Sequence, residues 1–232
     1  MSANKRDTAY LFFTDFYQNG NKPWAYKPNT LPYAVLGLNG YLKVHGFKSR
    51  IIDTRVEDYK KIDYSDALIF GLSTRTGAQI YNNLEIVRFL KDLHPQVPMV
   101  WGGVHSTLEA EQTARSEYVD IVVKHEGELT LLELVQLISA HPDDWKNRIN
   151  NIKGLVFKSG NSSVIVTPDR DFMDLNDLPL YDFSDVKADR YALSVFPLST
   201  SRAVRINAVF AIIYILIRSI GEACLPKRYL SR

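Results

Sequence analysis

Short apolar runs alternate with longer amphipathic segments between residues 8 and 141. The short runs are rich in β-branched and aromatic residues, which is typical of strands buried in a sheet. The longer segments repeat their apolar positions at helical spacing. We expect strands in "AYLFFTD" (9–15), "KSRIIDT" (48–54), "DALIFGLST" (66–74), "PMVWGG" (98–103) and "VDIVVKHEGE" (119–128), and helices over 31–46, 78–94, 107–116 and 129–141.

Local signals support the first two helices. Pro32 lies in the first turn of one, and Gly46 is positioned to end it. Its apolar face contains Val35, Leu38 and Leu42. The apolar face of the next helix is expected to contain Ile80, Leu84, Val87 and Leu90.

The alternation of strands and helices predicts an α/β fold with a parallel sheet. Right-handed crossovers then give a Rossmann-like, flavodoxin-type doubly wound domain over 8–141, with five strands in the order 2-1-3-4-5. After it, "IKGLVFKSGNSSVIVTPDR" (152–170) predicts a β-hairpin that turns at "SGNSS". "DFMDLNDLPLYDFSD" (171–185) has the composition of a polar linker, so we treat 149–202 as hairpin and linker.

Composition excludes several classes of protein. The 232 residues carry a net charge of only +2 with no basic run, so no nucleic-acid partner is expected. A single cysteine, Cys224, provides neither a disulfide framework nor a cysteine metal site. The first residues contain no secretory signal pattern, and no apolar run reaches the length of a membrane span. We therefore expect a cytoplasmic protein that does not enter a membrane.

The candidate ligand site lies at the carboxyl ends of the strands, where open α/β sheets bind ligands. Gly102 and Gly103 follow the fourth strand, where a ligand could lie flat on the backbone; a tight turn is the alternative explanation. Ser73, Thr74 and Thr76 follow the third strand, and their hydroxyls could bind a phosphate or an amide, or simply cap a turn.

Other polar residues at this edge are less specific. His105 and His125 could be polar contacts, or they could be solvated loop histidines, and no histidine pair has metal-ligand spacing. Glu126 and Glu128 flank Gly127 before a helix, where acidic side chains also suit the helix dipole. The chain has no Gly-x-Gly-x-x-Gly motif and no Walker lysine, so nothing indicates an ordinary nucleotide site.

A series of motifs, in this order and spacing, resembles the N-terminal half of cobalamin-dependent radical S-adenosylmethionine (radical SAM) enzymes. The motifs are "LPYAVLGLNGYLKVHGF", "IFGLSTRTG", "MVWGGVHST", "VVKHEGE", "IKGLVFK" and "DLNDLPLYDF". The resemblance extends over about residues 8–202. It implies a module that holds cobalamin with its corrin ring across the sheet edge and its nucleotide tail beside the fourth strand.

The resemblance also implies which residues contact cobalamin. The loop from Asp15 to Trp24 would lie under the ring and contains no histidine, so we expect base-off cobalamin without a protein histidine on cobalt. We expect no catalytic residue and no protein metal ligand within this chain. The implied cofactor-binding residues are Asp15, Ser73, Thr74, Thr76, Gly102, Gly103, Val104, His105, Glu126 and Gly127.

The chain departs from the family after Arg202. Members of the family continue into a Cys-x-x-x-Cys-x-x-Cys motif that binds a 4Fe–4S cluster for S-adenosylmethionine chemistry, and this motif is absent here. A cysteine codon shifted by one base becomes Val or Ala in the other frame, and Val204, Ala208 and Ala211 have the required spacing. We therefore interpret 203–232 as an out-of-frame tail that follows a deletion or a sequencing error.

The leading hypothesis is thus the cobalamin-binding module of a radical SAM enzyme, of a methyltransferase or ring-forming class, whose catalytic part and unknown substrate site are missing. One alternative is a stand-alone cobalamin carrier or sensor. Another is a flavodoxin-like or sugar-nucleotide-binding module that does not bind cobalamin.

Overall fold

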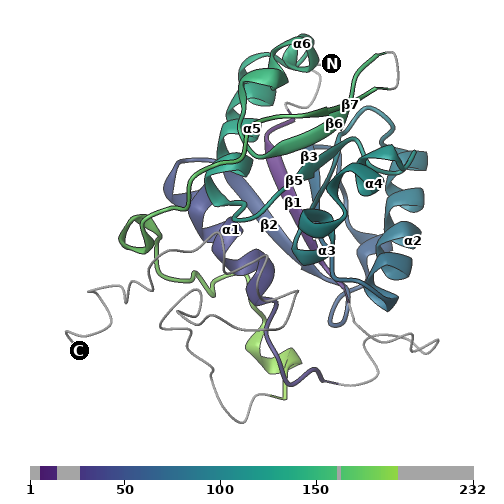
Figure 1. Cartoon of the computed structure of the whole chain (residues 1–232). Helices are drawn as coiled ribbons and strands as arrows, with labels where there is room; N and C mark the ends of the chain where they lie inside the picture. Colours follow the sequence, from purple (N-terminus) through teal and green to yellow (C-terminus); the bar gives the residue numbers. More distant parts are fainter. Residues whose placement is uncertain (1–5, 15–26, 161–162, 193–232) are drawn as a thin grey trace, which may run out of the picture.

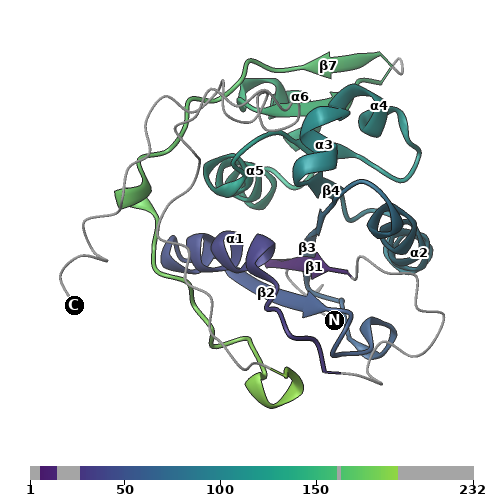
Figure 2. The same ribbon diagram turned by 60° about the horizontal axis from the view of Figure 1, so that its bottom comes forward.

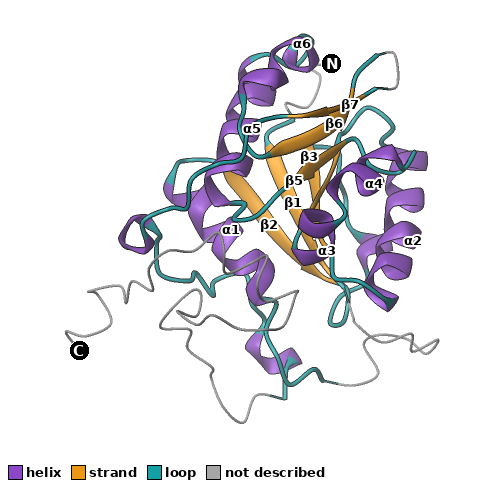
Figure 3. Cartoon of the chain, viewed as in Figure 1, coloured by secondary structure: helices purple, strands orange, loops and turns teal. Residues whose placement is uncertain are grey.

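A computed structural model describes residues 6–14, 27–160 and 163–192. Its centre is a sheet of seven strands in the order β2-β1-β3-β4-β5-β6-β7 (Figure 3). Strands β1 to β5 pair in parallel, whereas β6 and β7 are antiparallel to their neighbours. The strands are β1 (Thr8–Phe13), β2 (Lys48–Asp53), β3 (Ala67–Ser73), β4 (Met99–Gly102), β5 (Ile121–Val123), β6 (Leu155–Lys158) and β7 (Val164–Val166).

Helices cover both faces of the sheet. Figure 2 shows α1 and α5 on one face and α2, α3 and α4 on the other. The α-helices are α1 (Tyr33–Val44), α2 (Ala78–Leu93), α3 (Val104–Leu108), α4 (Ala110–Arg115), α5 (Glu128–Ala140) and α6 (Trp145–Arg148). The doubly wound arrangement and the 2-1-3-4-5 order of the parallel strands are therefore confirmed.

The strands β1, β3, β4 and β5 are almost wholly apolar because both faces of the sheet are covered, whereas the edge strand β2 also contains polar and charged residues. In β1, Leu11 and Phe13 belong to the core under α1 and α5, and Tyr10 and Phe12 belong to the core under α2. No residue of β1 is exposed, so the strand has no polar alternation. None of the helices in the described ranges has the length and apolar character needed to cross a bilayer.

Helix α1 has the expected limits. It begins directly after Pro32 and ends before Gly46, whose φ of +82° is a left-handed conformation that glycine adopts without strain.

The buried face of α2 differs from the expected one. Ile80 and Leu84 are only half-buried, whereas Gln79 and Asn83 are fully buried together with Val87 and Leu90. The buried amides form hydrogen bonds with the loops after β1 and β3, so the helix presents a polar strip at its N-terminal end. The spacing of apolar residues could not predict this buried face of α2, because two of its buried side chains are polar.

The expected β-hairpin follows the doubly wound domain, and its strands also join the sheet. The hairpin turns at the expected residues, but β6 pairs antiparallel with β5 and extends the sheet from five strands to seven. A two-stranded hairpin is marginal in water by itself, and β5 would otherwise present an open edge. The single helix expected over 107–116 is also divided, with a break at Glu109 between α3 and α4.

The segment that follows the hairpin is more than a polar linker. We call residues 169–192 the strap. Figure 1 shows the strap, in green, running from β7 past α5 and along α1. It contains short 3-10 helices at Leu175–Asp177 and Ala188–Arg190. The apolar side chains that it packs against the core are Met173, Leu178, Tyr181, Phe183 and Val186.

Candidate functional site

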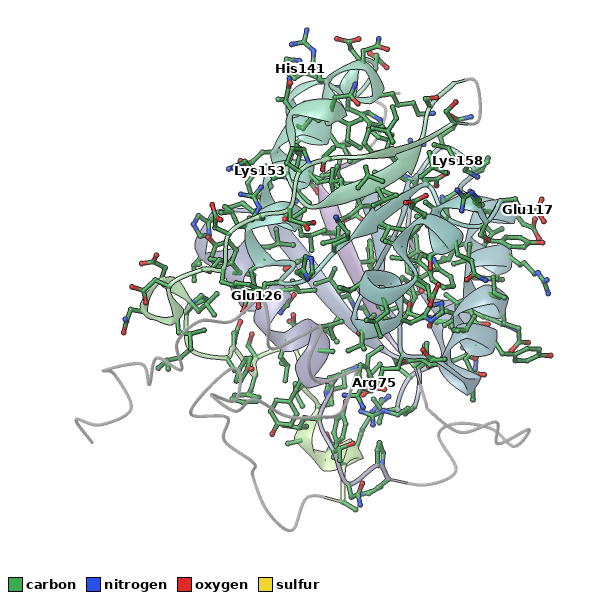
Figure 4. All side chains as sticks on the ribbon, viewed as in Figure 1. Arg75, Glu117, Glu126, His141, Lys153 and Lys158 are labelled. Atoms are coloured by element: carbon green, nitrogen blue, oxygen red, sulfur yellow. The ribbon has the colours of Figure 1, made fainter. Side chains whose placement is uncertain are left out.

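A cavity of about 390 Å³ opens at the carboxyl ends of β1, β3, β4 and β5, between α1 and α5. Its walls are mostly apolar and small, and Figure 4 labels two of its charged members, Arg75 and Glu126. The lining residues are Leu11, Tyr33, Ala34, Val35, Gly37, Leu38, Gly71, Leu72, Ser73, Arg75, Val100, Gly102, Gly103, Val123, His125, Glu126, Gly127, Glu128, Leu131 and Tyr181.

Half of the residues expected at the site line this cavity: Ser73, Gly102, Gly103, Glu126 and Gly127. Thr74, Thr76, Val104 and His105 lie close to it in sequence but outside its lining. Asp15 lies outside the described residues.

Glycine occupies positions 102 and 103 for different structural reasons. Gly103 has a φ of +94°, and a Cβ there would lie 2.7 Å from the Thr74 carbonyl oxygen, so the fold itself requires glycine. A Cβ on Gly102 would meet only Val123, at 3.8 Å or more, which is ordinary contact. Gly102 therefore leaves space in the cavity wall that the packing of the protein does not require.

The loop after β3 is fastened to the loop after β4 through Thr74. The Thr74 side chain is fully buried, and its hydroxyl oxygen accepts a hydrogen bond from Asn83 Nδ2 at 2.9 Å. Its backbone N–H donates to the Gly102 carbonyl at 2.8 Å, and its own carbonyl accepts from the His105 N–H at 3.1 Å. Thr74 therefore links the loops after β3 and β4 to each other and to α2 at the edge of the cavity.

Thr76 and His105 form a pair on the outer edge. The Thr76 hydroxyl lies 3.1 Å from His105 Nδ1, and Thr76 is exposed. Val104, in the first turn of α3, is 37% exposed. These groups face the rim of the sheet edge rather than the cavity.

Polar side chains on α2 fix the loops after β1 and β3. Asn83 accepts a hydrogen bond from the Thr14 hydroxyl at 2.9 Å, and Gln79 Nε2 donates to the Thr14 carbonyl at 3.0 Å. The Gln79 side-chain oxygen accepts from the Arg75 backbone N–H at 2.7 Å. Because these groups are buried and paired, the two loops have little freedom at the cavity.

The segment after β5 is held from two sides. His125 has a φ of +58°, which is uncommon for a residue other than glycine. Its backbone N–H donates to the Thr107 hydroxyl at 2.9 Å, and its Nε2 lies 3.6 Å from Asp169 of the strap. A hydrogen bond from Lys124 holds the pKa of Asp169 below its usual range. The Glu126 carboxylate accepts from the Met173 N–H at 3.2 Å.

Sequence reasoning missed most of the apolar lining. Leu38 and Leu131 come from helix faces that resemble ordinary core positions, and Tyr181 lies in the presumed linker. The sequence did contain a signal that Gly71 lines a site, because glycine inside an otherwise apolar strand often marks a close approach of another group.

The shape and chemistry of the cavity suit one kind of ligand. Apolar walls with glycines at the sheet edge accept a flat group, and the serine, arginine and acidic residues near the opening suit polar substituents. Among the described residues, no group of three or more His, Cys, Asp or Glu is arranged to hold a metal ion.

Comparison with known proteins agrees with this geometry. Residues 26–135 match the B12 binding domain family. The chain is 31% identical over 172 residues to an uncharacterized methyltransferase of Pyrococcus horikoshii, a match that covers 69% of this chain and 36% of the relative. It is 26% identical over 166 residues to the anaerobic magnesium-protoporphyrin IX monomethyl ester cyclase of Rubrivivax gelatinosus, covering 68% of this chain and 29% of that protein. The chain thus spans about a third of the length of these relatives.

Two solved structures share the fold. The cobalamin-dependent S-adenosylmethionine radical enzyme OxsB, with aqua-cobalamin and S-adenosylmethionine bound, superposes with a TM-score of 0.62 at 19% identity, over 85% of this chain and 27% of that one. The radical S-adenosylmethionine methyltransferase TsrM of Kitasatospora setae, with cobalamin and a 4Fe–4S cluster bound, has a TM-score of 0.53 at 20% identity, over 71% of this chain and 31% of that one. The match of residues 26–135 to the B12 binding domain family, the doubly wound sheet and the cavity at its carboxyl edge agree, and the fold is similar to that of these two cobalamin-bound proteins.

Proposed function

We propose that the cavity between α1 and α5 receives the nucleotide tail of cobalamin, with the corrin ring across the carboxyl edge of the sheet. The single observation that carries this proposal is the position of the cavity within the matched family region. Among the described residues, every member of its lining except Leu11 and Tyr181 lies within 26–135. The volume of about 390 Å³ suits the tail, and the larger ring would remain outside at the edge.

Individual residues have distinct roles in this proposal. Gly102 leaves room for the tail beside β4, and Ser73 offers a hydroxyl to its polar part. Glu126 and Gly127 form the opposite wall. Thr76 and His105, on the outer edge, would meet amide groups of the ring. Bound cobalamin supplies a cobalt centre that can carry a methyl group.

We further propose that cobalamin binds base-off, without a protein histidine on cobalt. The loop after β1, residues 15–26, contains no histidine. The test is the electron paramagnetic resonance spectrum of the Co(II) form bound to the protein. A spectrum without nitrogen splitting from a lower axial ligand agrees with the proposal, and a clear nitrogen triplet contradicts it.

In this proposal the chain is part of a cytoplasmic radical SAM enzyme of a methyltransferase or ring-forming class. The match covers only 36% of an uncharacterized methyltransferase and 29% of a cyclase, which supports a larger protein. The 4Fe–4S cluster and S-adenosylmethionine would bind in a part that this chain lacks. Residues 203–232 would then be read out of frame, and resequencing the DNA around the Arg202 codon tests this. A neighbouring frame with the three-cysteine motif is expected, and its absence favours a stand-alone carrier or sensor.

The direct test of the proposed function is an absorbance titration of the purified chain with hydroxocobalamin. We expect saturable binding of one cobalamin per chain with a shifted corrin spectrum. A chain that leaves hydroxocobalamin unbound but binds a flavin or a nucleotide sugar would instead be a flavodoxin-like or sugar-nucleotide-binding module.

A further inference from the structure

Tyr181 is the member of the cavity lining that comes from the strap. It lies far beyond residue 135, where the match to the B12 binding domain family ends. Of the lining residues in the described part of the chain, only Leu11 also lies outside the matched range, and Leu11 belongs to the central strand β1. The wall of the cavity is therefore completed by a segment outside the matched domain.

Ion pairs and hydrogen bonds hold the strap against α1 beside Tyr181. Lys43 Nζ lies 3.3 Å from Asp182 Oδ2 and 2.8 Å from Asp185 Oδ2. Asn39 Nδ2 donates to Asp185 at 2.9 Å. Although burial lowers the pKa of Lys43, the hydrogen bonds to both carboxylates raise it overall. The lysine is therefore charged at neutral pH and fastens the residue next to Tyr181.

The backbone of the strap lies close to the helix at the same place. A Cβ on Gly40 would meet the Asp182 backbone nitrogen at 3.7 Å and the Leu180 carbonyl oxygen at 3.8 Å. Gly40 itself is buried under the strap. The backbone on both sides of Tyr181 therefore lies close to α1.

Both ends of the strap are also fixed. At the first end, Arg170 Nε donates to the Thr130 hydroxyl of α5 at 3.0 Å. At the other end, the Tyr191 hydroxyl donates to Asp53 at 2.8 Å and the Ala192 N–H donates to the Pro28 carbonyl at 2.9 Å. The strap is therefore a fixed part of the fold with Tyr181 between its anchors.

Tyr181 forms an aromatic wall together with Tyr33 of α1. The two ring centroids are 5.9 Å apart at an interplanar angle of 64°, an edge-to-face arrangement. Burial, followed by the charge of Tyr181, raises the pKa of Tyr33. Both rings line the cavity, so a flat group that enters it meets aromatic surface contributed by the strap.

We propose that Tyr181 is a binding residue for the nucleotide base of the cobalamin tail, and that the strap completes the cobalamin site. The inference rests on the proposed function, because it requires the tail to occupy the cavity. Base–aromatic stacking has an energy that corresponds to about five- to 150-fold in affinity, so we expect loss of the ring to weaken cobalamin binding at least about fivefold.

The test compares hydroxocobalamin affinity in wild type and three single variants. Tyr181→Ala is expected to weaken binding at least about fivefold, whereas Tyr181→Phe retains the ring and is expected to bind within about twofold of wild type. Leu180→Ala is the matched control, because Leu180 is 52% exposed and outside the cavity lining. The thermal midpoints of all variants are measured in parallel, so that unfolding cannot be mistaken for lost contact.

A second probe distinguishes contact with the base from a general effect of the strap. Aquocobinamide has the corrin ring but no nucleotide base, so its affinity is expected to be unchanged in Tyr181→Ala. Lys43→Met removes the ion pairs outside the cavity and is expected to weaken cobalamin binding by releasing the strap.

The outcomes separate the inference from the proposed function. If wild type does not bind hydroxocobalamin, the proposed function fails. If wild type binds but Tyr181→Ala binds within twofold of it, or loses cobinamide and cobalamin affinity equally, the role of Tyr181 is refuted and the proposed function stands.

Discussion

Adding one methyl group at Gly103 should destabilise the protein, whereas the same change at Gly102 should leave its stability almost unchanged. At Gly103 the methyl group would lie 2.7 Å from the Thr74 carbonyl oxygen and 2.9 Å from its nitrogen, with a φ of +94°. A left-handed conformation costs a non-glycine residue about 1–2 kcal/mol, and overpacking adds about 1–3 kcal/mol. Gly103→Ala should therefore lower the free energy of unfolding by roughly 2–5 kcal/mol.

At Gly102 the same methyl group meets only Val123 at ordinary contact distance. The free energy of unfolding should change by less than about 0.5 kcal/mol. The added carbon points into the space that we assign to the tail, and Gly102→Val occupies more of it. Overpacking of about 1–3 kcal/mol in the complex corresponds to roughly five- to 150-fold weaker cobalamin binding.

Thermal unfolding and a hydroxocobalamin titration, performed on both variants, measure these effects. For a domain of this size, about 1 kcal/mol corresponds to roughly 2–4 °C, so the loss in Gly103→Ala should exceed about 4 °C. Gly102→Val should retain the wild-type midpoint and lose affinity. If Gly102→Val binds hydroxocobalamin like wild type, the tail does not pass beside β4 and the assignment of the cavity is refuted.

Three further outcomes follow from buried or charged groups around the site. Asn83→Ala leaves buried hydrogen-bond partners unsatisfied and should destabilise the protein by about 2–4 kcal/mol in urea unfolding; a loss below about 1 kcal/mol would contradict the role of this network. Asp53→Asn leaves the buried guanidinium of Arg55 without its carboxylate at 2.7 Å and should cost about 3–5 kcal/mol, whereas a neutral effect in the same assay would show that the pair is dispensable. Hydrogen bonds from the Ser184 N–H and hydroxyl, followed by Lys43, lower the pKa of Asp182, so its stabilisation of the strap is complete above the ordinary value of about 3.9 and is lost as the pH falls through the lowered value. Amide exchange in the strap, corrected for its intrinsic pH dependence, should accelerate in that acidic range; unchanged protection there would contradict this assignment.

The central sheet could be predicted because its strands are buried on both faces. The run at Thr8–Phe13 contains no exposed residue, and the carboxyl-edge rule then located Ser73, Gly102 and Gly103 at the site. These inferences need only local patterns and one topological rule.

The features that could not be predicted depend on long-range contacts, which leave no periodic pattern in the sequence. Gln79 and Asn83 are polar yet fully buried, because their partners lie in loops far away along the chain. The strap places Tyr181 in the cavity, although a segment with proline and many acidic residues looks like a solvated linker. Pairing of β6 with β5 could not be inferred, because the edge that it covers exists only in the folded sheet.

Amide hydrogen exchange of the chain with hydroxocobalamin and with aquocobinamide most directly tests whether the cavity holds the nucleotide tail. If the tail occupies the cavity, hydroxocobalamin slows amide exchange in residues 33–38 and 126–131, which line the cavity from α1 and from the start of α5. Cobinamide, which has no base to insert, should leave these segments unprotected. Equal protection by both corrinoids, or cobalamin binding that leaves both segments unprotected, would contradict the assignment of the cavity to the nucleotide tail.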